Sequence, residues 1–179
     1  MSLTLFTGVM KSGKTKALIE EFNKLKSPDS LVIKHSIDKR FSNEYIQSRN
    51  GEKIKADLIL DNNYLNVGFL SNRIKSDYIK NVFISEFNLF SEDYYYFIAN
   101  NYKYINFFVE GLVYDYQNKF FGYMYKLMEL ENVKVKEFFT FCEACEVNTA
   151  VISCRLVDSK EKILIGDKEY QPRCLDCSV

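Results

Sequence analysis

A glycine-containing segment near the N-terminus has residues that could bind a phosphate chain. The pattern G-x-x-x-x-G-K-[ST] is matched by Gly8, Val9, Met10, Lys11, Ser12, Gly13, Lys14 and Thr15. In such a loop, backbone N–H groups and the positive end of the next helix point towards a polyanion. Lys14 is expected to reach the β- and γ-phosphates, and the Thr15 hydroxyl is expected to bind Mg²⁺. The pattern therefore predicts a site for a nucleoside triphosphate, with a purely structural turn as the alternative.

Four of the five cysteines form two close pairs whose thiolates could bind a metal ion. Each pair has the form Cys-x-x-Cys, and 28 residues separate Cys142 and Cys145 from Cys174 and Cys177. Two such turns can complete the shell of four sulfurs that Zn²⁺ favours, which leaves no open position for catalysis. The long interval suggests that a loop extends from the site. The alternative is a pair of disulfides, which a reducing cytosol disfavours.

The elements that position these residues follow an α/β pattern. Short, nearly continuous apolar runs are typical of strands in a parallel sheet covered by helices on both faces, and they occupy residues 3–6, 31–33, 82–84 and 105–109. Helices are expected over residues 16–26 and 94–101. The three tyrosines at 94–96 are interpreted as packing residues rather than base-stacking residues.

The pattern changes in the last quarter of the chain. We interpret residues 1–133 as a P-loop NTPase-type nucleotide-binding domain. Residues 134–179 would form a small zinc-ribbon-like module with antiparallel strands over 150–156 and 162–165. The fifth cysteine, Cys154, is expected to be a small buried residue on one of these strands.

The charge balance argues against a general attraction to nucleic acids or anionic membranes. The chain has 24 basic and 24 acidic residues and one histidine, so its formal net charge is zero. No stretch approaches the roughly 18 apolar residues that span a bilayer, and the N-terminus runs into the first predicted strand without a signal-peptide pattern. We therefore expect a cytoplasmic protein whose partners include neither nucleic acid nor a membrane.

Taken in order along the chain, several segments resemble the type II thymidine kinases. They are the phosphate loop, Val32 to Lys34 with Asp38 to Arg40, Ile46 to Gly51, Gly111 to Gly122, and the two cysteine pairs. The segment Ile165 to Cys174 is similar to the loop by which these enzymes close over thymidine. This resemblance implies ATP and thymidine as substrates, Mg²⁺ and structural Zn²⁺ as metal ions, and formation of dTMP for nucleotide salvage and DNA synthesis. Family members generally form dimers or tetramers, so it also implies a homo-oligomer.

The resemblance implies roles for individual residues around the substrates. Asp38 and Arg40 match an Asp-x-Arg pattern of the triphosphate site, where Arg40 would neutralise phosphate charge near the acceptor hydroxyl; a solvated ion pair is the alternative. Met10 would line the thymine pocket. Five further matches would form the wall and the closing loop of the nucleoside site: Leu112, Tyr116, Phe121, Arg155 and Tyr170.

The segment after the predicted strand at 82–84 contains the implied catalytic base. Glu86 matches the glutamate that accepts the proton of the sugar 5′-hydroxyl, while Lys14 and Arg40 would stabilise the transferred group; a carboxylate that only caps the next segment is the alternative for Glu86. Ser85 stands where the family has an aspartate that serves the metal ion. Loss of a metal anchor can slow phosphoryl transfer without abolishing binding.

Two further function classes stay open because of this departure. One is a catalytically impaired thymidine-kinase-like protein that binds nucleotides or other proteins. The other is a different P-loop activity, either an NTPase or a kinase for another deoxynucleoside, which a phosphate loop alone does not exclude.

Overall fold

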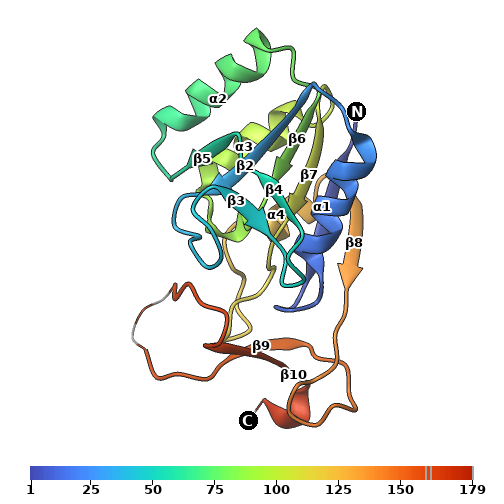
Figure 1. Cartoon of the computed structure of the whole chain (residues 1–179), viewed down its shortest axis with the longest axis vertical. Coiled ribbons are helices and arrows are strands. Elements are labelled where there is room, and N and C mark those ends of the chain that lie inside the picture. Colours follow the sequence, from blue (N-terminus) through green and yellow to red (C-terminus); the bar gives the residue numbers. More distant parts are fainter. Residues whose placement is uncertain (160, 162, 179) are drawn as a thin grey trace.

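A parallel sheet of six strands forms the centre of the computed structural model, which describes residues 1–159, 161 and 163–178 (Figure 1). The strands run in the order β5-β2-β6-β7-β1-β8, and each neighbouring pair is parallel. The bounds of the sheet strands are β1 Leu3–Gly8, β2 Ser30–His35, β5 Leu58–Leu60, β6 Asn81–Ile84, β7 Asn106–Glu110 and β8 Lys134–Phe138. The helices are α1 Lys14–Leu25, α2 Leu65–Ser76, α3 Glu92–Asn101 and α4 Met124–Met128, with short 3-10 turns at Phe87–Leu89 and Leu175–Cys177. Two small antiparallel ribbons pair β3 Tyr45–Gln47 with β4 Lys53–Lys55, and β9 Ile152–Arg155 with β10 Tyr170–Arg173.

Helices cover both faces of the sheet, as the apolar runs predicted. On one face, Leu18 and Ile19 of α1 and the β3–β4 ribbon pack against the sheet. On the other face, α2, α3 and α4 enclose a larger core that includes Tyr94, so the packing interpretation of that tyrosine is confirmed. The predicted helices at 16–26 and 94–101 are confirmed as α1 and α3. The predicted α/β fold class is therefore confirmed.

The carboxyl ends of the parallel strands meet at one edge of the sheet, where the C-terminal module lies (Figure 1). The register places Phe6 of β1 beside Glu110 of β7, and Ile84 of β6 beside Val109 of β7. The phosphate loop, Ser85 and Glu110 therefore follow or end neighbouring strands at the same edge. Ligands of open α/β sheets bind at this edge, so the fold brings the predicted site residues to a suitable place.

The C-terminal ribbon differs in part from the prediction. Strand β9 lies inside the predicted 150–156 and confirms it, but residues 163–165 form no strand, and residue 162 lies outside the described residues. The partner of β9 is β10, in which Pro172 lies opposite Ser153. Proline is uncommon inside a strand because it cannot donate a ladder hydrogen bond. In this short ribbon the Pro172 carbonyl instead accepts a hydrogen bond from the Glu143 N–H at 2.9 Å.

The main sheet continues beyond residue 133. Strand β8 pairs in parallel with β1, from Thr4 beside Lys134 to Gly8 beside Phe138. Its alternating residues belong to an exposed sheet edge and not to the C-terminal ribbon. The division of the chain into domains at 133/134 stays a prediction; β8 follows that boundary and pairs with β1 of the first part.

We expect Gly8→Ala to lower the free energy of unfolding by about 3 kcal/mol, because two effects act at this position. An added Cβ would lie 2.1 Å from the Phe138 carbonyl oxygen, and the backbone φ is +138°. The matched control is Gly68→Ala in α2, where no described atom lies within 4 Å of the added Cβ. The control is expected to raise stability by up to about 1 kcal/mol. Urea unfolding of the wild type and both variants measures the change in the free energy of unfolding. A Gly8→Ala protein as stable as the Gly68→Ala control would show that β1 and β8 separate readily at Phe138.

Candidate functional site

The phosphate loop joins the carboxyl end of β1 to the start of α1. Gly13 has φ +95° and directly precedes the helix, and its carbonyl accepts the Ala17 N–H at 3.0 Å. The Lys14 ammonium is buried and donates to the Val9 carbonyl across the loop at 2.8 Å. Burial lowers the pKa of Lys14, although the carboxylates of Glu110 and Glu86 oppose this effect. A buried cation beside a helix N-terminus is an arrangement that suits a polyphosphate.

One cavity of about 340 Å³ brings most of the predicted site residues together. Its lining includes residues predicted for the triphosphate, for catalysis and for the nucleoside: Met10, Lys11, Ser12, Gly13, Lys14, Thr15, Asp38, Arg40, Glu86, Leu112, Tyr116, Phe121, Arg155 and Tyr170. Gly8 and Val9 line a second cavity of about 250 Å³ instead. The first cavity also includes Ser85 in its lining, next to Glu86.

Arg40 connects Asp38 to Glu86 at this cavity. Its Nε donates to Asp38 Oδ1 at 2.7 Å, and its Nη2 forms an ion pair with Glu86 Oε1. The side chains of Arg40, Asp38 and Glu86 are only 18%, 9% and 13% exposed. Burial opposes the charge of Arg40, but the two carboxylates outweigh it and raise the pKa of the guanidinium. The group is therefore a partly buried network and not the solvated pair considered as an alternative.

The backbone at Glu86 is strained. Its φ of 53° and ψ of 49° lie in the left-handed region, which costs energy in a residue with a Cβ. The turn is held by Glu110, whose Oε1 accepts the Glu86 N–H at 3.1 Å, and by Asn88, whose Oδ1 accepts the Leu112 N–H at 2.8 Å. Strain of this kind persists only where surrounding contacts fix it, and it is concentrated at functional sites.

An aromatic and cationic cluster lines the cavity from the C-terminal module. The Arg155 guanidinium lies 3.7 Å from the ring centroid of Tyr116, and its Nη2 donates to the Tyr170 hydroxyl at 2.9 Å. That hydroxyl donates to the Leu164 carbonyl at 3.0 Å. The three residues were predicted from separate parts of the sequence, and the structure brings them into contact.

Several residues of the site carry no clear sequence signal. Ser153 Oγ accepts the Met10 N–H at 2.9 Å, and Lys11 forms an ion pair with Glu143 at 2.8 Å, so the C-terminal module holds the phosphate loop at two points. Arg49 and Asp167 form a further ion pair at the cavity. A serine in a strand gives no signal, and the ion pairs join residues far apart in sequence.

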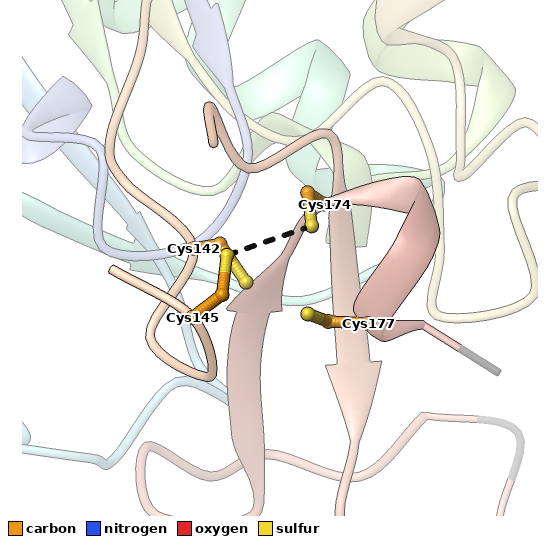
Figure 2. Close-up of side chains that lie close together, drawn as sticks. All are labelled: Cys142, Cys145, Cys174 and Cys177. Atoms are coloured by element: carbon orange, nitrogen blue, oxygen red, sulfur yellow. Dashed lines mark hydrogen bonds between the residues drawn. The ribbon is translucent and has the colours of Figure 1, made fainter. Parts of the chain in front are cut away.

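The four paired cysteines form one cluster in the C-terminal module, with their side chains close together (Figure 2). Their sulfur atoms lie within 4.8 Å of one another, and those of Cys145 and Cys174 are 3.9 Å apart. A tetrahedral zinc site with Zn–S bonds of about 2.3 Å has sulfur atoms about 3.8 Å apart. All five cysteines are free thiols, so the disulfide alternative is wrong for these residues. The donor set fits structural zinc, and Cys154 lies outside the cluster on β9 as a partly buried residue.

Glu110, which the sequence did not single out, is fully buried below this site. Burial and the nearby Glu86 raise its pKa to about 7, while Lys14 and the Ser85 hydroxyl act in the opposite direction. Since an ordinary glutamate has a pKa of 4.5, the folded protein keeps a proton between these values that the unfolded chain has lost. Glu110 therefore stabilises the fold at low pH, and about 3 kcal/mol of this stability is lost as the pH rises through about 7.

We expect this loss to appear as a pH-dependent difference in the free energy of unfolding between the ligand-free wild type and the Glu110→Gln variant. The stability of the variant relative to the wild type should increase from about pH 5 to pH 8. Urea unfolding over this range measures it, with Glu137→Gln on the exposed edge strand as the matched control. A constant difference would contradict the raised pKa.

Comparison with known proteins agrees with the arrangement of the site. A family model described as thymidine kinase matches residues 1–178. The thymidine kinase of Mesomycoplasma hyopneumoniae (strain 7448) is 34% identical over 183 residues, covering 98% of this chain and 94% of the relative. That of Mycoplasma mobile is 30% identical over 179 residues (98% and 86%), and that of Amsacta moorei entomopoxvirus is 30% identical over 185 residues (99% and 97%). The chain belongs to the thymidine kinase family.

Proposed function

We propose that this protein transfers the γ-phosphoryl group of ATP to the 5′-hydroxyl of thymidine. The observation that carries the proposal is one cavity whose lining includes Met10 to Thr15 of the phosphate loop, the Arg40–Glu86 pair and the aromatic cluster. Phosphoryl transfer depends mainly on positioning and on charge stabilisation, and this cavity supplies residues for both. Family membership agrees with this reaction.

Each part of the cavity has a separate task in the proposed reaction. The loop from Gly8 to Thr15 would hold the triphosphate through backbone N–H groups, with Lys14 at the β- and γ-phosphates. Glu86 would accept the proton of the 5′-hydroxyl as general base. Arg40, which Asp38 orients, would stabilise the negative charge of the transferred group.

Oxygen donors for Mg²⁺ also lie at this cavity. The Thr15 hydroxyl and Ser85 line it, and the buried Glu110 lies directly behind Ser85. Such hard oxygen donors suit Mg²⁺, which usually keeps several of its water molecules. When bound with ATP, Mg²⁺ neutralises charge on the phosphates.

The nucleoside would bind against the side chains contributed by both parts of the chain. Met10, Leu112 and Phe121 offer apolar contacts, and Tyr116 offers an aromatic face. Tyr170 and Arg155 would hold the closing loop, while zinc would fix the module from which that loop extends.

The cellular location and the oligomeric state of the protein are proposed from the same family membership. We propose a cytoplasmic homo-oligomer, either a dimer or a tetramer, as the resemblance implies. Of the helices formed by the described residues, none has the length and hydropathy needed to cross a bilayer.

The test is transfer of labelled γ-phosphate from ATP to thymidine by the zinc-loaded protein. Deoxycytidine, deoxyguanosine and deoxyadenosine serve as competing acceptors, and Lys14→Met serves as a variant with a disrupted phosphate site. Labelled dTMP formed only by the wild-type protein would support the proposal. Saturable ATP binding without dTMP would favour the impaired homologue, and transfer to another nucleoside or to water would favour a different P-loop activity.

A further inference from the structure

Ser85 and Glu110 are in direct contact at the carboxyl edge of the sheet. Ser85 follows the last residue of β6, and Glu110 is the last residue of the neighbouring strand β7. The Ser85 hydroxyl donates to Glu110 Oε1 at 2.7 Å. Ser85 is 3% exposed and lines the cavity, whereas Glu110 is 0% exposed and lies behind it.

Half of the Glu110 carboxylate has no partner. Its Oε1 accepts from Ser85 and from the Glu86 N–H, but Oε2 is buried and meets no hydrogen-bond donor among the described residues. Burying a carboxylate with an unsatisfied oxygen is unfavourable. A glutamine at this position could accept the same two hydrogen bonds through its Oε1 without burying a charge. Holding the turn therefore does not explain why the residue is an acid.

We infer that Ser85 and Glu110 together hold the water of a divalent cation at this cavity, the task that the resemblance to thymidine kinases assigns to one aspartate at position 85. Because the Ser85 proton is directed to Glu110, the lone pairs of Oγ are left to accept a hydrogen bond from water on a bound divalent cation. The carboxylate supplies the negative charge, one side chain further from the cavity. Glu110 is thus a positioning residue that acts through Ser85, and this inference rests on the proposed function.

The electrostatic surroundings support this division of tasks. Lys14, the expected phosphate ligand, interacts favourably with Glu110, and Glu86 interacts unfavourably with it. A cation that arrives with the triphosphate would offset the repulsion between the two carboxylates.

The experiment measures how much a divalent cation tightens ATP binding. Calorimetry gives the Kd of ATP with Mn²⁺ and without added divalent cation, in both cases for the zinc-loaded protein, and the ratio of the two is the gain from the metal ion. Glu110→Gln keeps the acceptor for Ser85 and for the Glu86 N–H, and it is expected to reduce this gain by about 10–100-fold. Without added divalent cation the variant should bind ATP at least as tightly as wild type, because a negative charge near the phosphates is gone.

Rescue separates this inference from a role in holding the turn. The double variant Ser85→Asp with Glu110→Gln is expected to restore the gain to near the wild-type value, because it places a single carboxylate at position 85, directly at the cavity. Ser85→Asp alone should not increase the gain in ATP affinity over that of the wild type, since two adjacent carboxylates repel and one stays protonated. Three results would overturn the inference. They are an unchanged gain in Glu110→Gln, an equal loss of ATP affinity with and without Mn²⁺, and a failed rescue.

A second variant decides the matter if Glu110→Gln does not fold. Ser85→Ala leaves Glu110 bonded to the Glu86 N–H but removes the hydroxyl that faces the cavity. It is expected to reduce the gain as well, and an unchanged gain would overturn the inference. None of these measurements uses thymidine, so a protein that forms no dTMP can still show the pattern, and the two proposals fail separately.

Discussion

Glu86→Gln is expected to lower kcat for thymidine phosphorylation by about 10²–10⁴-fold and to leave the Kd of ATP nearly unchanged. The amide has almost the same shape as the carboxylate but cannot accept the proton of the 5′-hydroxyl. Glu86 lies at the cavity beside Arg40, whereas the triphosphate site is formed by the separate phosphate loop. The chemical step should therefore suffer while nucleotide binding does not.

Three measurements test this expectation: single-turnover transfer to thymidine, calorimetric ATP binding and thermal unfolding. Glu92→Gln is the matched control, because Glu92 lies on α3 outside the cavity, pairs with Lys126 of α4, and has a side chain that is 43% exposed. That control should keep wild-type turnover. If Glu86→Gln also kept it, Glu86 would only hold the turn, and another group would have to take the proton.

Cys174→Ser is expected to remove tightly bound zinc and, with it, the thymidine-dependent stabilisation of the protein. The C-terminal module has few buried apolar residues of its own, among them Ala150 and Tyr170. Zinc binding contributes roughly 10–16 kcal/mol to the folding of small cysteine-based modules, so loss of one ligand should loosen the β9–β10 ribbon. Tyr170 and Arg155 would then no longer be held at the cavity.

Elemental analysis and thermal unfolding with and without thymidine measure this effect. For the wild type, thymidine at 100 times its Kd should stabilise by about 2.7 kcal/mol, and the variant should show almost none of this shift. Cys154→Ser is the control, because this residue lies on β9 outside the cluster. A Cys174→Ser protein that kept both zinc and the thymidine shift would show that the cluster does not support the nucleoside site.

The sequence predicted those parts of the protein in which neighbouring residues carry the chemistry. The phosphate loop and the cysteine pairs have fixed local spacing, and continuous apolar runs indicate strands buried on both faces. Strand β10 was not predicted because its residues were assigned to the closing loop, and the pairing of β8 with β1 was not predicted because an edge strand alternates like a ribbon. Both errors concern pairing between distant segments, which local patterns do not determine.

Local sequence patterns also do not indicate the contacts between distant residues within the site. The links from Ser153 to Met10 and from Arg49 to Asp167 join residues more than 100 positions apart, and no local pattern indicates them. Glu110 could have been noticed, because an acid directly after an apolar run ends a strand at the ligand-binding edge. Its partner Ser85 and its unpaired oxygen required the register of β6 and β7.

The left-handed backbone of Glu86 sets catalysis against stability. Glycine would adopt φ 53° without steric cost, whereas other residues lose roughly 1–3 kcal/mol in such a conformation. Glycine would, however, also remove the carboxylate that pairs with the partly buried Arg40 and that would serve as the general base. Thermostable versions of this protein will therefore have to gain their stability at other positions, since the reaction needs a side chain at this strained one.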